Sequence, residues 1–275
     1  MRTAPALLML LLAACGPSKD YATDMREQHD GETPTATGAT DGADGAGVVA
    51  ERVAYATVDG ESVTGYLARP EGATGGPGVV VIPEWWGLNE NIEAMARRLA
   101  GEGYTALAVD LYGGQTADTP DGAMSLMRAA MGREDALTDN LVQAYGYLAD
   151  SLGAERVGTI GWCFGGMWSL RTALALPGDV DATVIYYGRP VTDASRLEAL
   201  QMPVLAIFGA ADASIPLDTV SAFRDALTAA GVDHEVEVYE GAGHGFANPS
   251  GQAYDAEAAE DAWKRTTAFL AAHLR

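Results

Sequence analysis

Cys163 is the residue whose neighbours best suit a nucleophile. It lies in Gly161-Trp162-Cys163-Phe164-Gly165, directly after the strand-like run 156–160. A glycine two positions either side of a nucleophile is what a sharp strand-to-helix turn requires, because a Cβ there would collide with the neighbouring strand or helix. The turn lifts the side chain above the sheet and points a helix N-terminus at it, which favours a thiolate. This spacing makes the chain a candidate enzyme.

The pentapeptide alone leaves a second interpretation open. The chain has 33 glycines among 275 residues, so a pair of glycines four positions apart arises easily by chance. A lone cysteine is also commonly a small buried apolar residue. The choice between the two interpretations therefore depends on the rest of the chain.

Two later strand ends carry an acid and a histidine. Asp212 follows the apolar run 204–208, and His244 follows the strand-like run 235–239. Nucleophile, acid and histidine thus come in the order found in α/β-hydrolases, and each stands where ligands and catalytic groups collect in open α/β sheets. Taken singly, Asp212 could be a turn residue and His244 could bond locally within its loop.

The other histidines offer no rival base in the sequence. His29 lies in a linker-like stretch, His234 opens a strand and His273 is near the C-terminus. By elimination, His244 is the one plausible general base. With no second histidine or cysteine cluster, the sequence predicts no metal site, and we expect no metal or organic cofactor.

The residues that must position these groups form one α/β domain over 48–275. Short apolar runs alternate with helical patterns, as in a mostly parallel sheet with helices on both faces. Residues 53–58 and 62–69 predict an opening hairpin around Asp59-Gly60, and 78–83 predict a buried central strand. We find no repeat and no internal domain boundary.

Residues 1–15 predict an export signal. Arg2 precedes the apolar run 6–14, and Leu12-Ala13-Ala14-Cys15-Gly16 resembles the lipobox of bacterial lipoproteins. That resemblance implies cleavage before Cys15, a lipid on its thiol, and a place in the bacterial cell envelope, on the outer membrane or facing the periplasm. It also leaves Cys163 without a disulfide partner. The alternative is an ordinary signal peptide cut after Ala14, which would leave an exposed free thiol.

Residues 16–47 predict a flexible acidic linker. They contain no Val, Ile, Leu, Phe or Trp, so they cannot bury enough apolar surface to offset the entropy of ordering. As a coil, this stretch would span roughly 30 Å. The formal net charge of the whole chain is −21, which argues against nucleic acid and anionic membrane as partners. We therefore expect membrane contact through the lipid on Cys15 only, while the oligomeric state is open.

From about Tyr55 to Leu274 the chain resembles the dienelactone hydrolase family of α/β-hydrolases. Cysteine in place of the usual serine nucleophile is itself a trait of that family. The resemblance rests on a set of short motifs: Pro83-Glu84-Trp85-Trp86-Gly87, Asp110-Leu111-Tyr112, Gly161–Gly166, Ile185-Tyr186-Tyr187-Gly188, Asp212 and Gly243-His244-Gly245-Phe246.

The resemblance implies a role for each matching residue. Cys163 would attack an ester or lactone carbonyl, while Asp212 orients His244. The backbone N–H groups of Phe164 and Trp85 would form the oxyanion hole. Glu84 would contact the resting thiol and help it become a thiolate; without the family it is simply a carboxylate at a strand end.

The substrate does not carry over with the fold. Family members that cleave dienelactone hold its carboxylate with two arginines, and the matching positions here are Gly114 and Asn248. An uncharged or differently anchored small ester or lactone is therefore expected. Its pocket could be lined by aromatic side chains that could equally be core packing: Trp85, Trp86, Tyr112 and Phe246.

Two further functions remain open at this point. A catalytically silent envelope lipoprotein could use the cleft only for binding, but it would not be expected to keep nucleophile, acid, base and Glu84 together. A thioesterase or peptidase could use the same triad, although nothing in the sequence predicts a peptide groove.

Overall fold

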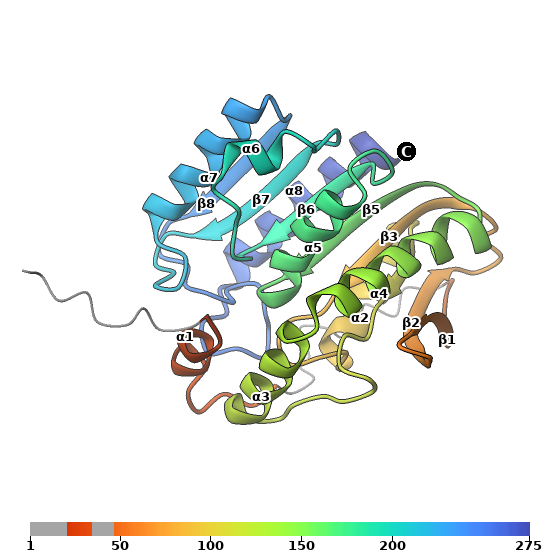
Figure 1. The fold of residues 1–275 in the computed structure, drawn as a ribbon, viewed down its shortest axis with the longest axis horizontal. Coiled ribbons are helices and arrows are strands. Elements are labelled where there is room, and N and C mark those ends of the chain that lie inside the picture. Colours follow the sequence, from red (N-terminus) through yellow and green to blue (C-terminus); the bar gives the residue numbers. More distant parts are fainter. Residues whose placement is uncertain (1–20, 35–46) are drawn as a thin grey trace, which may run out of the picture.

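The strands form a single sheet whose parallel part carries the candidate site. This computed structural model describes residues 21–34 and 47–275. The strands are β1 (Val48–Val58), β2 (Glu61–Pro70), β3 (Gly76–Ile82), β4 (Thr105–Ala108), β5 (Ala154–Trp162), β6 (Ala182–Tyr186), β7 (Val204–Gly209) and β8 (His234–Tyr239). Their order across the sheet is β1-β2-β4-β3-β5-β6-β7-β8 (Figure 1).

The direction of the strands follows from how the chain connects them. The hairpin β1–β2 is antiparallel, and β2 pairs antiparallel with β4. From β4 through β8 every pair is parallel, because a helical crossover returns the chain to the same edge each time. Val79 to Ile82 are fully buried in β3, as a continuous apolar run in a covered parallel strand predicts. The predicted α/β-hydrolase sheet is confirmed.

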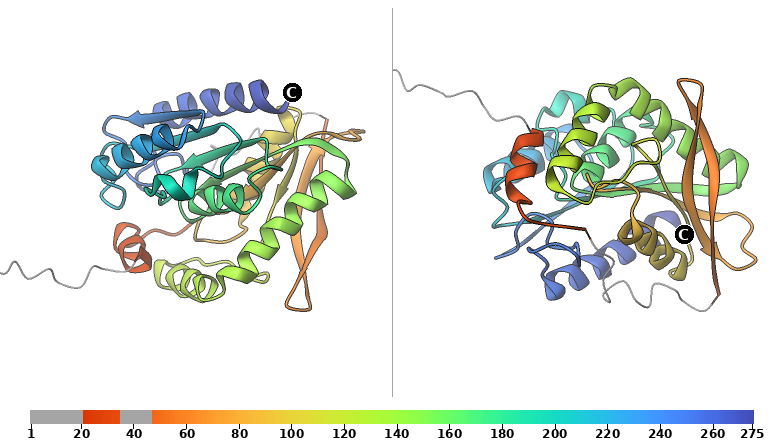
Figure 2. Two further views of the ribbon diagram at one scale, coloured as in Figure 1. Left: turned by 45° about the horizontal axis from the view of Figure 1, so that its top comes forward. Right: turned by 90° about the horizontal axis from the view of Figure 1, so that it is seen from below.

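Helices cover both faces of the sheet. They are α1 (Tyr21–Gln28), α2 (Glu90–Gly101), α3 (Pro120–Met131), α4 (Glu134–Gly146), α5 (Phe164–Ala175), α6 (Ala194–Leu197), α7 (Leu217–Ala230) and α8 (Ala256–Leu274), with a π-helical turn at Tyr147–Ser151. α2 and α8 pack on one face, while α4 and α5 pack on the other (Figure 2). Within the described ranges, no helix is long and apolar enough to cross a membrane.

The prediction of a flexible linker is wrong for residues 21–34. This stretch forms α1 and the turn that follows it, and α1 lies beside α3 (Figure 2). Met25 is fully buried, and the Arg26 guanidinium pairs with Asp121 at 2.9 Å. The segment has too few apolar residues for a core of its own, but it buries Met25 by packing against the surface of the domain. Residues 1–20 and 35–46, which include Cys15, lie outside the described residues.

Candidate active site

Cys163 stands at the turn between β5 and α5, in a backbone conformation that few side chains adopt. Its φ is 54° and its ψ is −115°. The flanking glycines make the turn possible: a Cβ on Gly161 would lie 2.1 Å from the Gly165 carbonyl oxygen, and one on Gly165 would lie 2.2 Å from that of Ile82. The steric argument from the sequence is confirmed. Strained backbone of this kind persists where the surroundings force it, commonly at functional sites.

The environment of the thiol differs from the sequence expectation. Cys163 is only 2% exposed, and burial raises the pKa of its thiol. The neighbouring His29 ring and the Phe164 N–H at the start of α5 oppose that rise without cancelling it. The helix N-terminus therefore does favour the thiolate, but in this closed site burial outweighs it.

Asp212 and His244 meet at the ends of β7 and β8. His244 Nδ1 and Asp212 Oδ2 are 2.7 Å apart, and the other carboxylate oxygen accepts backbone N–H groups from Ser214 and Ile215. Burial would raise the pKa of Asp212, but His244 and these N–H groups hold it below its ordinary value. The carboxylate is thus ionised and fixes the ring of His244.

His244 and Cys163 are close together in space. A ring nitrogen of His244, a ring nitrogen of His29 and the Cys163 sulfur all lie within 4.8 Å of one another. Because Nδ1 of His244 is bound to Asp212, its Nε2 is the nitrogen free to face the sulfur, and that atom has no hydrogen-bond partner among the described residues. The sulfur, imidazole and carboxylate separated in the sequence therefore share one site.

Glu84 is buried at the end of β3, on the same edge of the sheet. Its carboxylate accepts a hydrogen bond from Asn248 Nδ2 at 2.5 Å and one from the Tyr187 hydroxyl at 3.4 Å. Burial raises the pKa of Glu84 to about 7, although His29, His244 and Asn248 oppose the rise. Asn248 is thus a direct partner of Glu84.

The sequence analysis missed His29, which it placed in the linker. The ring lies 5.0 Å from that of Trp85 and 5.7 Å from that of His244, measured between centroids. Its Nδ1 is 2.5 Å from Glu32 Oε2. Burial alone would lower the pKa of His29, but the Cys163 sulfur and Glu32 outweigh burial and raise the pKa to about 9. His29 is therefore a second imidazole beside the nucleophile. The only sign of this in the sequence is the presence of a histidine in the short segment that precedes the domain.

The proposed pocket residues lie in different surroundings. Trp85 and Trp86 are buried against His29, and burial, with the nearby Cys163 sulfur second, raises the pKa of Tyr112. Phe246 is fully buried against the rings of Tyr187 and Tyr239. Trp85 and Trp86 therefore lie against the His29 ring, and Tyr112 is near the Cys163 sulfur. A role for any of the four in binding substrate stays a prediction.

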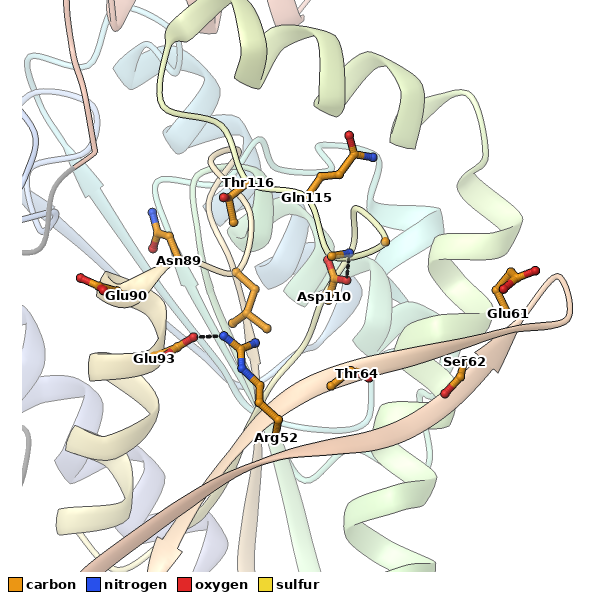
Figure 3. Close-up of a pocket in the computed structure, with 13 residues that line it drawn as sticks. Arg52, Glu61, Ser62, Thr64, Asn89, Glu90, Glu93, Asp110, Gln115 and Thr116 are labelled. Carbon is orange, nitrogen blue, oxygen red and sulfur yellow. Dashed lines mark hydrogen bonds and ion pairs between the residues drawn. The ribbon is translucent and has the colours of Figure 1, made fainter.

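A separate hollow of about 1000 Å³ lies between the β1–β2 hairpin and the start of α2 (Figure 3). Arg52 reaches across it to Glu93. Asp110, on its wall, already accepts the backbone N–H groups of Tyr112 and Gly114. None of Cys163, Asp212 and His244 lines this hollow. The candidate catalytic residues therefore lie outside this hollow.

Comparison with known proteins decides the family. The model of the dienelactone hydrolase family matches residues 63–274, which include Asp212, His244 and the turn Gly161–Gly165 around Cys163, here called the elbow. The chain belongs to the dienelactone hydrolase family. It is therefore an enzyme of an ester- and lactone-hydrolase family with the α/β-hydrolase fold, as the sequence predicted.

Relatives of this family match along nearly their whole length. The chain is 36% identical to Protein usf of Aquifex pyrophilus, covering 78% of this chain and 96% of that protein. It is 33% identical to a putative carboxymethylenebutenolidase of Aquifex aeolicus, over 79% and 96% of the two chains. A putative dienelactone hydrolase of Klebsiella pneumoniae has a similar solved structure, with a TM-score of 0.73, 33% identity and coverage of 82% and 98%.

Proposed function

We propose that this enzyme hydrolyses a small ester or lactone with Cys163 as nucleophile, His244 as base and Asp212 as the group that orients the base. The observation that carries the proposal is the chain of contacts from Asp212 to His244 at 2.7 Å and on to the buried sulfur. A nucleophile beside a base that is itself held by a third group is the arrangement that covalent hydrolysis needs.

The proposed reaction has two halves. His244 takes the thiol proton, the sulfur attacks the carbonyl carbon, and the alcohol leaves with that proton to give a thioacyl-enzyme. Water then gives a proton to His244, attacks the thioester and releases the acid and the free thiol. The N–H groups of Phe164 and Trp85 would stabilise the oxyanion in both halves, and loss of one such donor costs about 3–4 kcal/mol.

The proposed substrate is uncharged at the end that lies near Glu84. Asn248 is bonded to Glu84, and the backbone N–H of Gly114 is bonded to Asp110, so neither position offers a cation for a substrate carboxylate. Trp85, Trp86 and Tyr112 would instead give the acyl group an apolar surface. Cys163 is 2% exposed and His29 of the segment 21–34 lies beside it, so we infer that the structure describes a closed form and that this segment moves aside when substrate enters.

The experiment is hydrolysis of a short-chain p-nitrophenyl ester by the full-length chain. We expect Cys163→Ala and His244→Ala to abolish turnover and Cys15→Ser, which alters the other cysteine, to retain it. Equal rates in all four proteins would remove the proposal. A panel of lactones, acyl esters and thioesters would then define the substrate. A phosphotriester belongs in the panel, because a promiscuous phosphotriesterase that is dienelactone-hydrolase-like has a similar structure (TM-score 0.75, 29% identity).

We also propose export and a lipid on Cys15, from the lipobox-like sequence. Residues 16–20 are all that separate Cys15 from α1, and the six steps from Cys15 to Tyr21 span at most about 22 Å when extended. An anchored enzyme would therefore hold the surface that carries α1 close to the membrane. Labelled fatty acid should enter the full-length protein, and unchanged incorporation in Cys15→Ala would contradict the proposal.

A further inference from the structure

Three side chains of the types that bind transition metals meet in the closed site. A ring nitrogen of His29, a ring nitrogen of His244 and the Cys163 sulfur lie within 4.8 Å of one another. All three side chains are buried, at 7%, 6% and 2% exposure. Two of them come from strand ends of the domain, and the third comes from the segment that precedes it.

In both histidines the Nδ1 atom is bound to a carboxylate. Nδ1 of His29 is bound to Glu32 and Nδ1 of His244 is bound to Asp212, at 2.5 and 2.7 Å. Both Nε2 atoms are buried; that of His244 has no hydrogen-bond partner among the described residues, and His29 interacts with the Cys163 sulfur. Histidines that bind metal almost always donate their other ring N–H to such a carboxylate, which fixes the tautomer and raises the basicity of the free nitrogen.

We propose that His29 Nε2, His244 Nε2 and Cys163 Sγ bind a single transition-metal ion of the class that takes imidazole and thiolate together, with Zn²⁺ as its type. Thiolate and imidazole are the ligands that zinc prefers, whereas Mg²⁺ and Ca²⁺ select oxygen. Tetrahedral zinc places such ligand atoms roughly 3.4–3.6 Å apart. A contraction of at most about 1.2–1.4 Å brings the three atoms, now within 4.8 Å of one another, onto one ion and leaves a fourth position for water.

The charges around the cluster suit a cation. Glu32 and Asp212 stand behind the two histidines, and Glu84 is near enough to both to interact with their charges. Binding of a divalent ion releases the proton of the Cys163 thiol and any proton on His29 Nε2, so the sulfur enters the complex as thiolate. No oxidation or reduction is involved.

Such an ion would join the segment 21–34 to the domain through one coordination sphere. It would occupy the sulfur and the His244 nitrogen at once, so it would reversibly hold the site closed and without a free nucleophile. The proposal concerns binding and does not depend on the hydrolysis proposed above.

The test measures Zn²⁺ and Co²⁺ binding to the full-length chain, with Cys15→Ser in every protein so that Cys163 is the single thiol. We expect one Zn²⁺ per chain by equilibrium dialysis, a thiolate-to-cobalt charge-transfer band with Co²⁺, and protection of Cys163 from iodoacetamide by Zn²⁺. Glu32→Gln should weaken Zn²⁺ binding by about 10–100-fold. His29→Gln should weaken it further, and His29→Cys, which supplies another zinc ligand, should restore it.

Matched controls separate a ligand from a packing residue. His234→Gln alters a histidine outside the cluster and should leave Zn²⁺ affinity unchanged. The unfolding midpoint of each variant without metal shows whether it is folded. Zn²⁺ affinity that is equal in the parent, His29→Gln and Cys163→Ser proteins would overturn the proposal, as would absence of binding to the parent. Loss of binding in both His29→Gln and His29→Cys would equally overturn the assignment of His29 as a ligand.

Discussion

Two histidine–carboxylate pairs face the Cys163 sulfur, and the chain builds them in different ways. Asp212 and His244 are 32 residues apart and meet because β7 and β8 are neighbours in the sheet. His29 and Glu32 are three residues apart and meet within one turn of chain. The first pair is fixed by the framework of the fold, while the second is only as well placed as the short segment that carries it.

This difference in how the two pairs are held suggests different roles for them. Asp212 and His244 cannot leave the sulfur without moving two strands, so their geometry is available in every turnover. His29 lies beside the sulfur, and under the proposed function it would withdraw when substrate enters. We therefore assign the chemistry to the framework pair and the closing of the site to the segment pair.

The largest effect should come from removing the framework carboxylate. Asp212→Asn leaves the shape of the site intact but allows the wrong tautomer of His244, so we expect kcat to fall by about 10⁴-fold. Glu32→Gln makes the same chemical change in the other pair and should cost far less, because His29 is not the proposed base. Hydrolysis of a p-nitrophenyl ester measures both, and equal losses in the two variants would show that the pairs share the catalysis.

The elbow should be the next most sensitive feature. Gly165→Ala places a Cβ 2.2 Å from the Ile82 carbonyl oxygen, and neither backbone can yield, so we expect unfolding to become easier by about 3 kcal/mol or more. Gly101→Ala is the matched control, since its Cβ would meet nothing within 4 Å, and its effect should stay within about 1 kcal/mol. Denaturant unfolding compares them; similar midpoints would mean that the elbow is not tightly packed.

Most of the framework could be predicted because its signals are local and repeated. The runs 79–82 and 204–208, which became most of β3 and β7, are continuous and apolar, and the second half of β5 is buried. Parallel strands bring their carboxyl ends to one edge, so the order of Cys163, Asp212 and His244 sufficed to predict one site. The elbow glycines followed from sterics alone.

The segment 21–34 could not be predicted by the same means. Its few apolar residues predict no core, and the surface that buries Met25 belongs to the domain. The wrong linker prediction had a second consequence. Because His29 was assigned to a linker, it was not considered as a base or a metal ligand. The linker prediction also left out the His29 ring, which opposes the rise that burial causes in the pKa of the Cys163 thiol. Contact between a distant segment and the nucleophile is a tertiary effect that no local pattern carries.

Loosening the segment should expose the nucleophile. Met25→Asp buries a charge in an apolar site, which costs several kcal/mol unless the segment detaches. Since each 1.4 kcal/mol is tenfold in the opening equilibrium, we expect iodoacetamide to label Cys163 at least about tenfold faster, in a Cys15→Ser background. Thr33→Ala, an exposed change in the same segment, is the control. Unchanged labelling of Met25→Asp would show that the segment does not shield the sulfur.

The smallest effect should come from the ion pair between the segment and α3. The Asp121 side chain is 72% exposed and that of Arg26 is 36% exposed. Arg26 also pairs with Asp30 at 3.2 Å, so Asp121→Asn removes one partner and leaves another. We expect labelling of Cys163 to rise roughly two- to fivefold, and high salt to shrink the difference. Asp118→Asn removes the same charge without touching Arg26. If Asp121→Asn exposed the sulfur as strongly as Met25→Asp, surface charge rather than burial of Met25 would be what holds the segment in place.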